Sequence, residues 1–134
     1  MSQHDAVLFA NEAFYLAFSS QDLAAMTDLW ASGVPVSCIH PGWPPLLGRE
    51  EVLQSWEGIF SGDAPPAITC HGPRAHVYGD AATVLCFERI PESYLIATNI
   101  FVREGGLWKI VHHQAGPTNG GPVSEHGGEL PMVN

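Results

Sequence analysis

Near residue 67 the apolar residues change from a helical spacing to a spacing of two, and this change constrains the fold more than any other feature. Strand-like alternation follows in four runs, at about 67–78, 81–90, 94–104 and 107–115. Gly79-Asp80 and Gly105-Gly106 are typical of the tight turns in β-hairpins. Because such short turns join antiparallel neighbours, we predict a meander of long strands.

Before this point the apolar residues recur at helical spacing. Ser2 is placed to cap a first helix, and Asp5, three residues on, gives it a start like a capping box. Apolar residues cover most of the circumference of this helix, which predicts burial on more than one side. A second, short helix would start at Ser19 or Ser20 and end at Gly33.

A short strand, a stiff loop and a third helix complete the first half of the chain. We predict the strand over Val34 to Ile39 and the proline-rich loop over His40 to Pro45. The third helix would open at Gly48 and run to about Phe60. Helices grouped before a run of antiparallel strands indicate an α+β fold, with the helices on one face of the sheet.

Charge in this sequence is scarce and mostly negative. Of the 134 residues 14% are charged, and 5 basic against 14 acidic residues give a formal net charge of −9. So few basic residues cannot neutralise a row of phosphates or hold an anionic lipid surface, and we expect neither nucleic acid nor a membrane as partner. The hydrophobic share of 46% excludes disorder throughout. The length suits one domain, which we place at 1–116, followed by a Gly/Pro-rich tail at 117–134.

The sequence shows no targeting signal and no metal motif. It begins without the basic and apolar segments of a secretory signal, and no apolar run reaches the length of a membrane span. Three cysteines without a C-x-x-C motif indicate reduced thiols and a cytoplasmic protein, with the cysteines as small core residues: Cys38, Cys70 and Cys86. Because the His and Cys residues lack the spacing of metal ligands, we expect no metal and no cofactor.

Three stretches of the sequence resemble the nuclear transport factor 2-like superfamily, and its SnoaL-like branch above all. They are NEAFYLAFSSQDLAAMTDLW, CIHPGWPPLLGREEVLQSWEGI and ATNIFVREGGLWKIVHHQAGP, and the resemblance spans about residues 5–117. The last stretch also resembles the association domain of calcium/calmodulin-dependent protein kinases. Because the superfamily hosts isomerases, dehydratases, cyclases and non-catalytic domains, these stretches indicate the fold more sharply than the function.

The resemblance implies a cone, in which a strongly curved antiparallel sheet wraps around the three helices and leaves a pocket on its concave face. It also implies a homodimer that forms through the convex face. The resemblance to the kinase association domains places three polar side chains on the concave side: Glu88, Asn99 and His113.

Alternation along the last strand sorts its side chains between the two faces. It places Val111 on the concave side with His113, and Trp108 and Ile110 on the convex side. A single bulge would exchange His113 for His112, because one extra residue reverses the alternation. On a regular strand only one of these two histidines can serve the pocket.

Glu88 is the residue most informative about chemistry. Desolvation on a buried strand would raise the pKa of its carboxyl, as suits a general acid or base near neutral pH. His113, or alternatively His40, would be its partner in proton transfer. The alternative is that Glu88 forms an ion pair with an arginine or faces solvent at the end of its strand.

Aromatic and polar side chains would form the rest of the pocket. Six are candidate ligand contacts: His40, Trp43, Trp56, Asn99, Phe101 and Tyr15. The two tryptophans would supply flat apolar walls, unless both are core aromatics. The Asn99 amide would hold a ligand carbonyl or orient Glu88, unless it bonds to the backbone.

Two functions from different classes fit this pocket. The first is an enzyme that uses acid–base chemistry on a small, mostly apolar molecule, for isomerisation, dehydration or cyclisation. The second is a non-catalytic module that binds a small molecule or self-associates. Both faces of the strands are apolar, so we expect the helices to cover one face and a second subunit to cover the other.

Overall fold

One curved sheet forms the framework of the molecule. The computed structural model describes residues 1–63 and 67–122. The strands lie in the order β2-β1-β6-β5-β4-β3. Their bounds are β1 Ser37–Ile39, β2 Leu46–Leu47, β3 Thr69–Tyr78, β4 Ala81–Ile90, β5 Ser93–Glu104 and β6 Leu107–Pro117. The four long strands β3 to β6 are antiparallel neighbours, which confirms the predicted meander.

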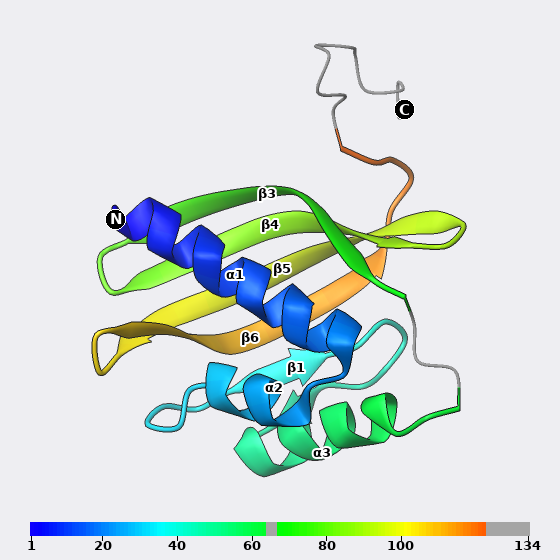
Figure 1. The fold of residues 1–134 in the computed structure, drawn as a ribbon, viewed down its shortest axis with the longest axis horizontal. Helices are drawn as coiled ribbons and strands as arrows, with labels where there is room; N and C mark the ends of the chain where they lie inside the picture. The colour runs from blue at the N-terminus through cyan, green and yellow to red at the C-terminus, as the bar shows by residue number, and fades with distance from the viewer. Residues whose placement is uncertain (64–66, 123–134) are drawn as a thin grey trace.

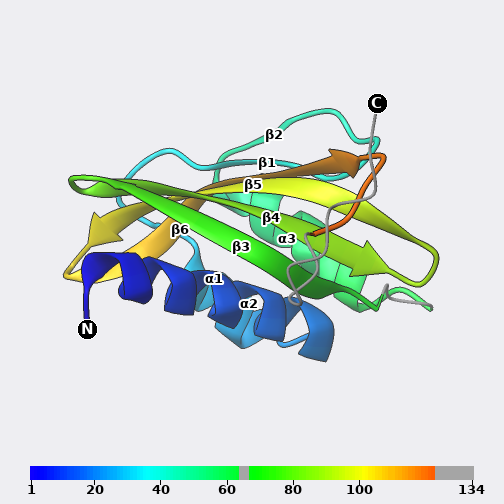
Figure 2. The same cartoon turned by 90° about the horizontal axis from the view of Figure 1, so that it is seen from above.

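Three helices pack against the concave face of this sheet, which confirms the α+β cone. They are α1 Gln3–Ser20, α2 Leu23–Leu29 and α3 Arg49–Phe60. Helix α1 runs obliquely across the long strands, and α2 and α3 lie below its C-terminal half in Figure 1. Figure 2 shows α1 and α2 together on one side of the sheet. Side chains on β4 alternate between buried and more exposed, as expected for a sheet with helices on one face only.

The ends of the helices follow the sequence only in part. Ser2 caps α1 as predicted, because its Oγ accepts a hydrogen bond from the Asp5 backbone N–H at 3.0 Å. Helix α2 ends at Leu29, with Trp30 as its C-cap, and not at Gly33. Among the described residues, no helix has both the length and the apolar character needed to cross a lipid bilayer.

The start of α2 differs from the prediction. Its N-cap is Asp22, whose Oδ1 accepts a hydrogen bond from the Ala25 backbone N–H at 3.0 Å. Ser19 and Ser20, which we expected as caps, lie inside α1 and donate their hydroxyls to the Leu16 carbonyl. The predicted cap was wrong because serine satisfies its hydroxyl equally well inside a helix by bonding backwards.

The short strands close one side of the sheet. Strand β1 pairs in parallel with β6, and β2 pairs with β1 at the edge. Strand β1 is shorter than the strand predicted over 34–39, and the sequence analysis did not predict the two-residue β2. The parallel register places Cys38 beside His113, so the loop that starts at His40 reaches the concave side next to β6.

A bulge in β6 changes which of its side chains face the helices. The β5–β6 register shifts by one residue in the middle of the strands and leaves Val111 without a partner. Trp108 and Ile110 are therefore buried on the concave side, and the prediction that placed them on the convex face was wrong. His113 keeps its predicted side because the bulge precedes it.

The core fills the space between α1, α3 and the sheet. Its largest fully buried apolar side chains are Trp30, Trp56, Phe14, Phe101, Met26 and Ile110. Strand β6 continues to Pro117, so the predicted tail 117–134 begins with a strand residue. Residues 123–134 of that tail lie outside the described part of the chain, and the domain boundary stays a prediction.

We expect Asp22→Ala to lower the free energy of unfolding by about 1 kcal/mol, because it removes the side-chain cap of α2. Ser20→Ala is the matched control and should change stability by a few tenths of a kcal/mol at most, since its exposed hydroxyl bonds only within α1. Urea unfolding of both variants measures the difference. Equal losses in the two variants would show that Asp22 does not act as the cap.

Candidate functional site

A cavity of about 300 Å³ lies where β4 ends and β5 begins, and we call it the cone pocket. The residues that line it are Phe18, His40, Pro41, Trp43, Ile59, Ile68, Glu88, Ile90, Leu95 and His113. They come from α1, α3, the loop after β1, the residue before β3 and the strands β4, β5 and β6. Most are apolar or aromatic, the three ionisable ones are Glu88 and the two histidines, and no lysine or arginine is among them.

Glu88 lies on β4 with its side chain on the concave face and only 1% exposed. Within residues 1–63 and 67–122, no lysine or arginine forms a salt bridge with it, so the ion pair that the sequence left open is not made. Burial raises the pKa of Glu88 from 4.5 to about 7, although the hydrogen bond from Tyr15 acts in the opposite direction. The carboxyl is therefore poised to gain or lose a proton near neutral pH.

Tyr15 connects helix α1 to this carboxyl. Its hydroxyl donates a hydrogen bond to Glu88 Oε2 at 2.6 Å and accepts one from Asn99 Nδ2 at 3.2 Å. Burial and the nearby Glu88 raise the pKa of Tyr15 well above its usual value, so the phenol keeps its proton. The Tyr15 ring is buried in the core. It stacks on Phe18 and its hydroxyl bonds to Glu88, and both of these residues line the cone pocket.

His113 lies opposite Asn99 on the neighbouring strand, as the β5–β6 register requires. Its Nδ1 donates to Asn99 Oδ1 at 2.6 Å, because an amide oxygen can only accept. Its Nε2 lies 3.7 Å from Glu88 Oε2. Burial, with smaller contributions from His40 and His112, lowers the pKa of His113 to about 3. The contact is therefore not an ion pair at neutral pH, because the ring is neutral.

His40 forms the opposite wall of the pocket. Ser55 donates its hydroxyl to the Val52 carbonyl at 2.6 Å, so its oxygen accepts from His40 Nε2 at 2.9 Å. Burial lowers the pKa of His40 to about 4, and this ring too is neutral near pH 7. Trp43 packs edge-on against it at the rim, where the indole remains 45% exposed.

The other predicted contacts lie deeper in the core. Trp56 is fully buried and packs against His40 and Phe18, so it supports the pocket wall from behind. Phe101 pairs with Ala82, six residues along β4 from Glu88, which corresponds to about 20 Å of strand. A ligand contact for either residue stays a prediction, and their burial fits the core role that the sequence left open for Trp56.

Two buried polar residues were absent from the sequence-based site. Asn11 lies one helical turn before Tyr15, and its Oδ1 accepts a hydrogen bond from Asn99 Nδ2 at 2.9 Å. Ser55 holds His40. Both interrupt the apolar stripe of an otherwise buried helix face, since Asn11 falls between Val7 and Phe14 on α1. A single polar residue in such a stripe is the signal that could have found them.

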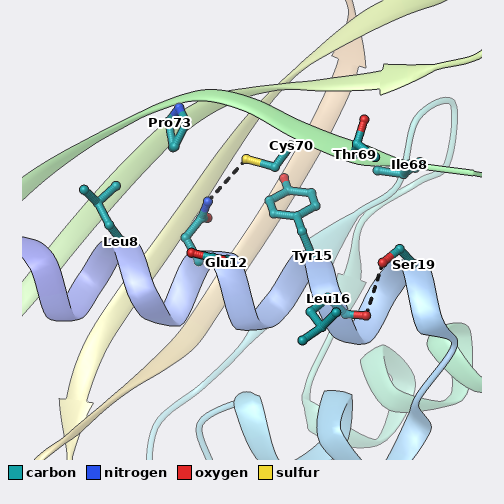
Figure 3. A pocket seen from close by; sticks show the side chains of 10 residues that line it. Leu8, Glu12, Tyr15, Leu16, Ser19, Ile68, Thr69, Cys70 and Pro73 are labelled. Atoms are coloured by element: carbon teal, nitrogen blue, oxygen red, sulfur yellow. Dashed lines mark hydrogen bonds between the residues drawn. The ribbon is translucent and has the colours of Figure 1, made fainter.

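A second cavity, of about 520 Å³, lies between α1 and β3, and we call it the α1–β3 cavity (Figure 3). Leu8, Leu16, Ile68 and Pro73 supply apolar surface, and Asn11, Tyr15 and Cys70 supply polar groups. Asn11 Nδ2 donates to Cys70 Sγ at 3.6 Å. Ile68 lines both cavities, so the cone pocket and the α1–β3 cavity are neighbours.

Metal-ligating side chains do not gather in the described part of the chain. No group of three His, Cys, Asp or Glu residues there lies close enough together to hold a metal ion. Cys38 lies under His40, and its Sγ is 3.6 Å from His40 Nε2. Burial raises the pKa of Cys38 to about 12, so its thiol stays protonated.

Comparison with known proteins agrees with the architecture. A family model for the SnoaL-like domain matches residues 7–118. A proposed dehydratase of the NTF2-like family from Streptomyces avermitilis is 34% identical, with a TM-score of 0.79 over 87% of this chain and 96% of that one. A proposed type II calcium/calmodulin-dependent protein kinase association domain from Thiobacillus denitrificans is 29% identical, with a TM-score of 0.73 over 82% of this chain and 93% of that one.

A curated relative extends the comparison to plants. The F-box protein SKIP8 of Arabidopsis thaliana is 29% identical over 112 residues, which are 82% of this chain. The match covers 48% of that relative, so the chain spans about half the length of the curated protein it matches.

The raised pKa of Glu88 makes stability depend on pH with a defined sign. Between pH 4.5 and about 7 only the folded chain holds this proton, so the free energy of unfolding falls as pH rises. The change of the pKa from 4.5 to about 7 corresponds to a total loss of about 3 kcal/mol. Glu88→Gln should lack this contribution and still accept the Tyr15 hydrogen bond.

Denaturant unfolding of both proteins from pH 4 to pH 8 measures the contribution. His40 and His113 act in the opposite direction, since their lowered pKa values destabilise the fold as pH falls below about 6.5. Both histidines are present in the two proteins, so the difference between the curves isolates Glu88. A difference that does not change between pH 4.5 and 7 would show that the carboxyl titrates normally.

Proposed function

Because the chain belongs to the SnoaL-like domain family, we propose that it is a proton-transfer enzyme that dehydrates or isomerises a small, mostly apolar, uncharged molecule in the cone pocket. Glu88 is the general acid, and His113 is the general base. His40 and Trp43 contact the substrate from the opposite wall. The similarity to a proposed dehydratase at 34% identity supports dehydration as the first reaction to test.

The pairing of Glu88 with His113 carries this proposal. Below pH 7 the carboxyl holds a proton while the imidazole, with its pKa near 3, does not. A neutral acid and a neutral base therefore lie side by side, with 3.7 Å between Glu88 Oε2 and His113 Nε2. Both groups line the same cavity, so one substrate can meet both.

This pair supports a balanced dehydration of a β-hydroxy carbonyl compound. His113 Nε2 removes a proton from the carbon next to the carbonyl, and the electrons of that C–H bond form the new C=C bond. Glu88 gives its proton to the departing hydroxyl, which leaves as water. Transfer of the proton from His113 to Glu88 then restores the starting state. An isomerisation uses the same two groups but returns the proton to another carbon.

The lining of the cone pocket supports an uncharged substrate. Its walls are mainly apolar or aromatic, and no cationic side chain is present among them to hold a carboxylate or a phosphate. The buried carboxyl would also repel an anion once ionised. The volume of about 300 Å³ lies at the lower end of the range for small-molecule pockets.

Glu88→Gln should lower turnover at least 100-fold, because glutamine keeps the hydrogen bond from Tyr15 but has no proton to give. The assay incubates a panel of small β-hydroxy ketones with the protein and follows loss of water by mass spectrometry. Small molecules that co-purify with the folded protein and are released when it is denatured supply further candidate substrates. Glu12→Gln, an exposed neighbour on α1, is the control and should retain full activity.

The wild-type rate should be highest below pH 7 and fall by half near pH 7, as Glu88 loses its proton. A Glu88→Gln variant with unchanged turnover, or a rate that rises through pH 7, contradicts the assignment of Glu88 as the acid. A molecule that binds in the pocket and is never converted would favour the alternative, a non-catalytic binding module.

We also propose that the convex face of the sheet joins two copies of the chain. Leu85 and Ile96 are 44% and 38% exposed on that face, and Phe87, Ile100 and Val102 are half-buried beside them. A soluble domain rarely leaves such a patch uncovered. The similarity at 29% identity to a proposed kinase association domain also supports self-association. The three free cysteines fit the reducing cytoplasm, which we propose as the compartment.

Leu85→Asp should convert the dimer to a monomer, because it places a charge in the centre of the convex patch. Sedimentation at micromolar concentrations measures the mass of wild type and variant. Leu16→Asp introduces the same charge at an exposed position on α1 and should remain dimeric. A wild-type protein that sediments as a monomer at these concentrations would refute the proposed interface.

A further inference from the structure

The protonated nitrogen of His113 depends on which way the Asn99 amide points. With Oδ1 toward His113, the ring nitrogen Nδ1 must donate, and Nε2 keeps a lone pair that faces Glu88. The reversed amide would present Nδ2 to Nδ1 and move the ring proton to Nε2. In that state His113 could not remove a proton from a substrate in the cone pocket. The orientation of one amide therefore decides whether the ring can act as a base.

The neighbours of Asn99 Nδ2 differ in how strongly they select its orientation. The Cys86 thiol at 3.9 Å can donate or accept, whereas the Tyr15 hydroxyl at 3.2 Å accepts, because its proton goes to Glu88 Oε2. Asn11 is different, because its amide has a distinct donor end and acceptor end. Its Oδ1 lies 2.9 Å from Asn99 Nδ2, and its own Nδ2 donates to Cys70 Sγ at 3.6 Å.

We propose that Asn11 is a positioning residue that holds the Asn99 amide in one orientation and thereby makes His113 present an unprotonated Nε2 to the cone pocket. The hydrogen bonds run in one direction from Asn11 to Cys70, from Asn99 to Asn11, and from His113 to Asn99. The role in catalysis rests on the proposed function, but the protonated nitrogen of His113 can be measured without any substrate.

The location of Asn11 explains how it acts without touching the substrate. Its side chain is 1% exposed and lines the α1–β3 cavity, and it is not among the residues that line the cone pocket. Figure 3 shows this cavity, with Cys70 of β3 above the Tyr15 side chain of α1. The two amides are 88 residues apart in sequence, so only the packing of α1 on β5 brings them together.

Nitrogen NMR of the imidazole rings tests the proposal on the full chain. In wild type at pH 6, His113 should carry its proton on Nδ1, with Nε2 unprotonated, and the His113→Asn variant identifies its signals. Asn11→Leu removes the closer of the two oxygen acceptors of Asn99 Nδ2 and leaves the Tyr15 hydroxyl at 3.2 Å, so the fraction of the Nδ1-protonated form should fall. Glu12→Gln changes the adjacent exposed residue and should leave the His113 signals unchanged.

A second readout follows the titration of Glu88 by the infrared band of its protonated carboxyl. In Asn11→Leu the ring can present an N–H to Glu88, which would stabilise the carboxylate and lower its midpoint below that of wild type. A purely structural loss would not move both readouts together. If Asn11→Leu fails to fold, Asn11→Ala removes the same acceptor without adding a branched side chain.

A wild-type His113 with its proton on Nε2 overturns the inference, whatever the variants do. Unchanged His113 signals in a folded Asn11 variant also overturn it. The proposed function fails separately: it fails if Glu88→Gln retains turnover, even when His113 is protonated on Nδ1 as expected.

Discussion

The burial of the Glu88 carboxyl without a cationic partner is the constraint on which the rest of the site depends. An ionised carboxylate in this position would lose its hydration, and no lysine or arginine in the described chain repays that loss. The phenol of Tyr15 supplies one strong hydrogen bond at 2.6 Å. One neutral donor partly offsets the cost, so the carboxyl retains its proton up to about pH 7.

The Glu88 carboxyl sets the direction of the hydrogen bonds made by Tyr15, Asn99 and His113. Tyr15 points its proton at Glu88, so its oxygen is free to accept from Asn99. Asn99 in turn has only its oxygen left for His113. The hydrogen bonds thus run in one direction from each group to the next, and Glu88 and His113 lie close together without forming an ion pair. The arrangement stabilises the fold and prepares the groups that we propose for proton transfer.

The packing of α1 on the sheet makes this network possible. Asn11 and Tyr15 lie one turn apart on the same face of α1 and meet strands β3, β4 and β5. Phe14 on the same helix packs edge-on against Trp56 of α3 and lies tilted against the His113 ring. The residue between Glu88 and His113 on the concave face is Ala97, which is small enough to let the two side chains approach across β5. A larger residue there would fill the space over which the acid and the base meet.

The spacing of apolar residues by itself determined the class of the fold. Alternation on β4 grouped Glu88 with Val84 and Cys86, and short glycine turns required an antiparallel meander, because both are local properties of a strand. The resemblance to the kinase association domains supplied the face on which this group lies. The bulge at Val111 could not be predicted from alternation, since the pattern of apolar side chains does not show where an extra residue is inserted. Alternation therefore put Trp108 and Ile110 on the wrong face.

Only the tertiary structure decided the partners of these residues. The sequence left open whether Glu88 pairs with an arginine, and it gave no role to Asn11 or Ser55. Hydrogen bonds between residues as far apart as Tyr15 and Glu88 depend on how a helix crosses a sheet, which no local spacing encodes. The sequence thus determined the order of the helices and strands and the turns that join the long strands. The crossing of α1 over the strands determined which of them meet, because a hydrogen bond needs its two atoms within about 3 Å.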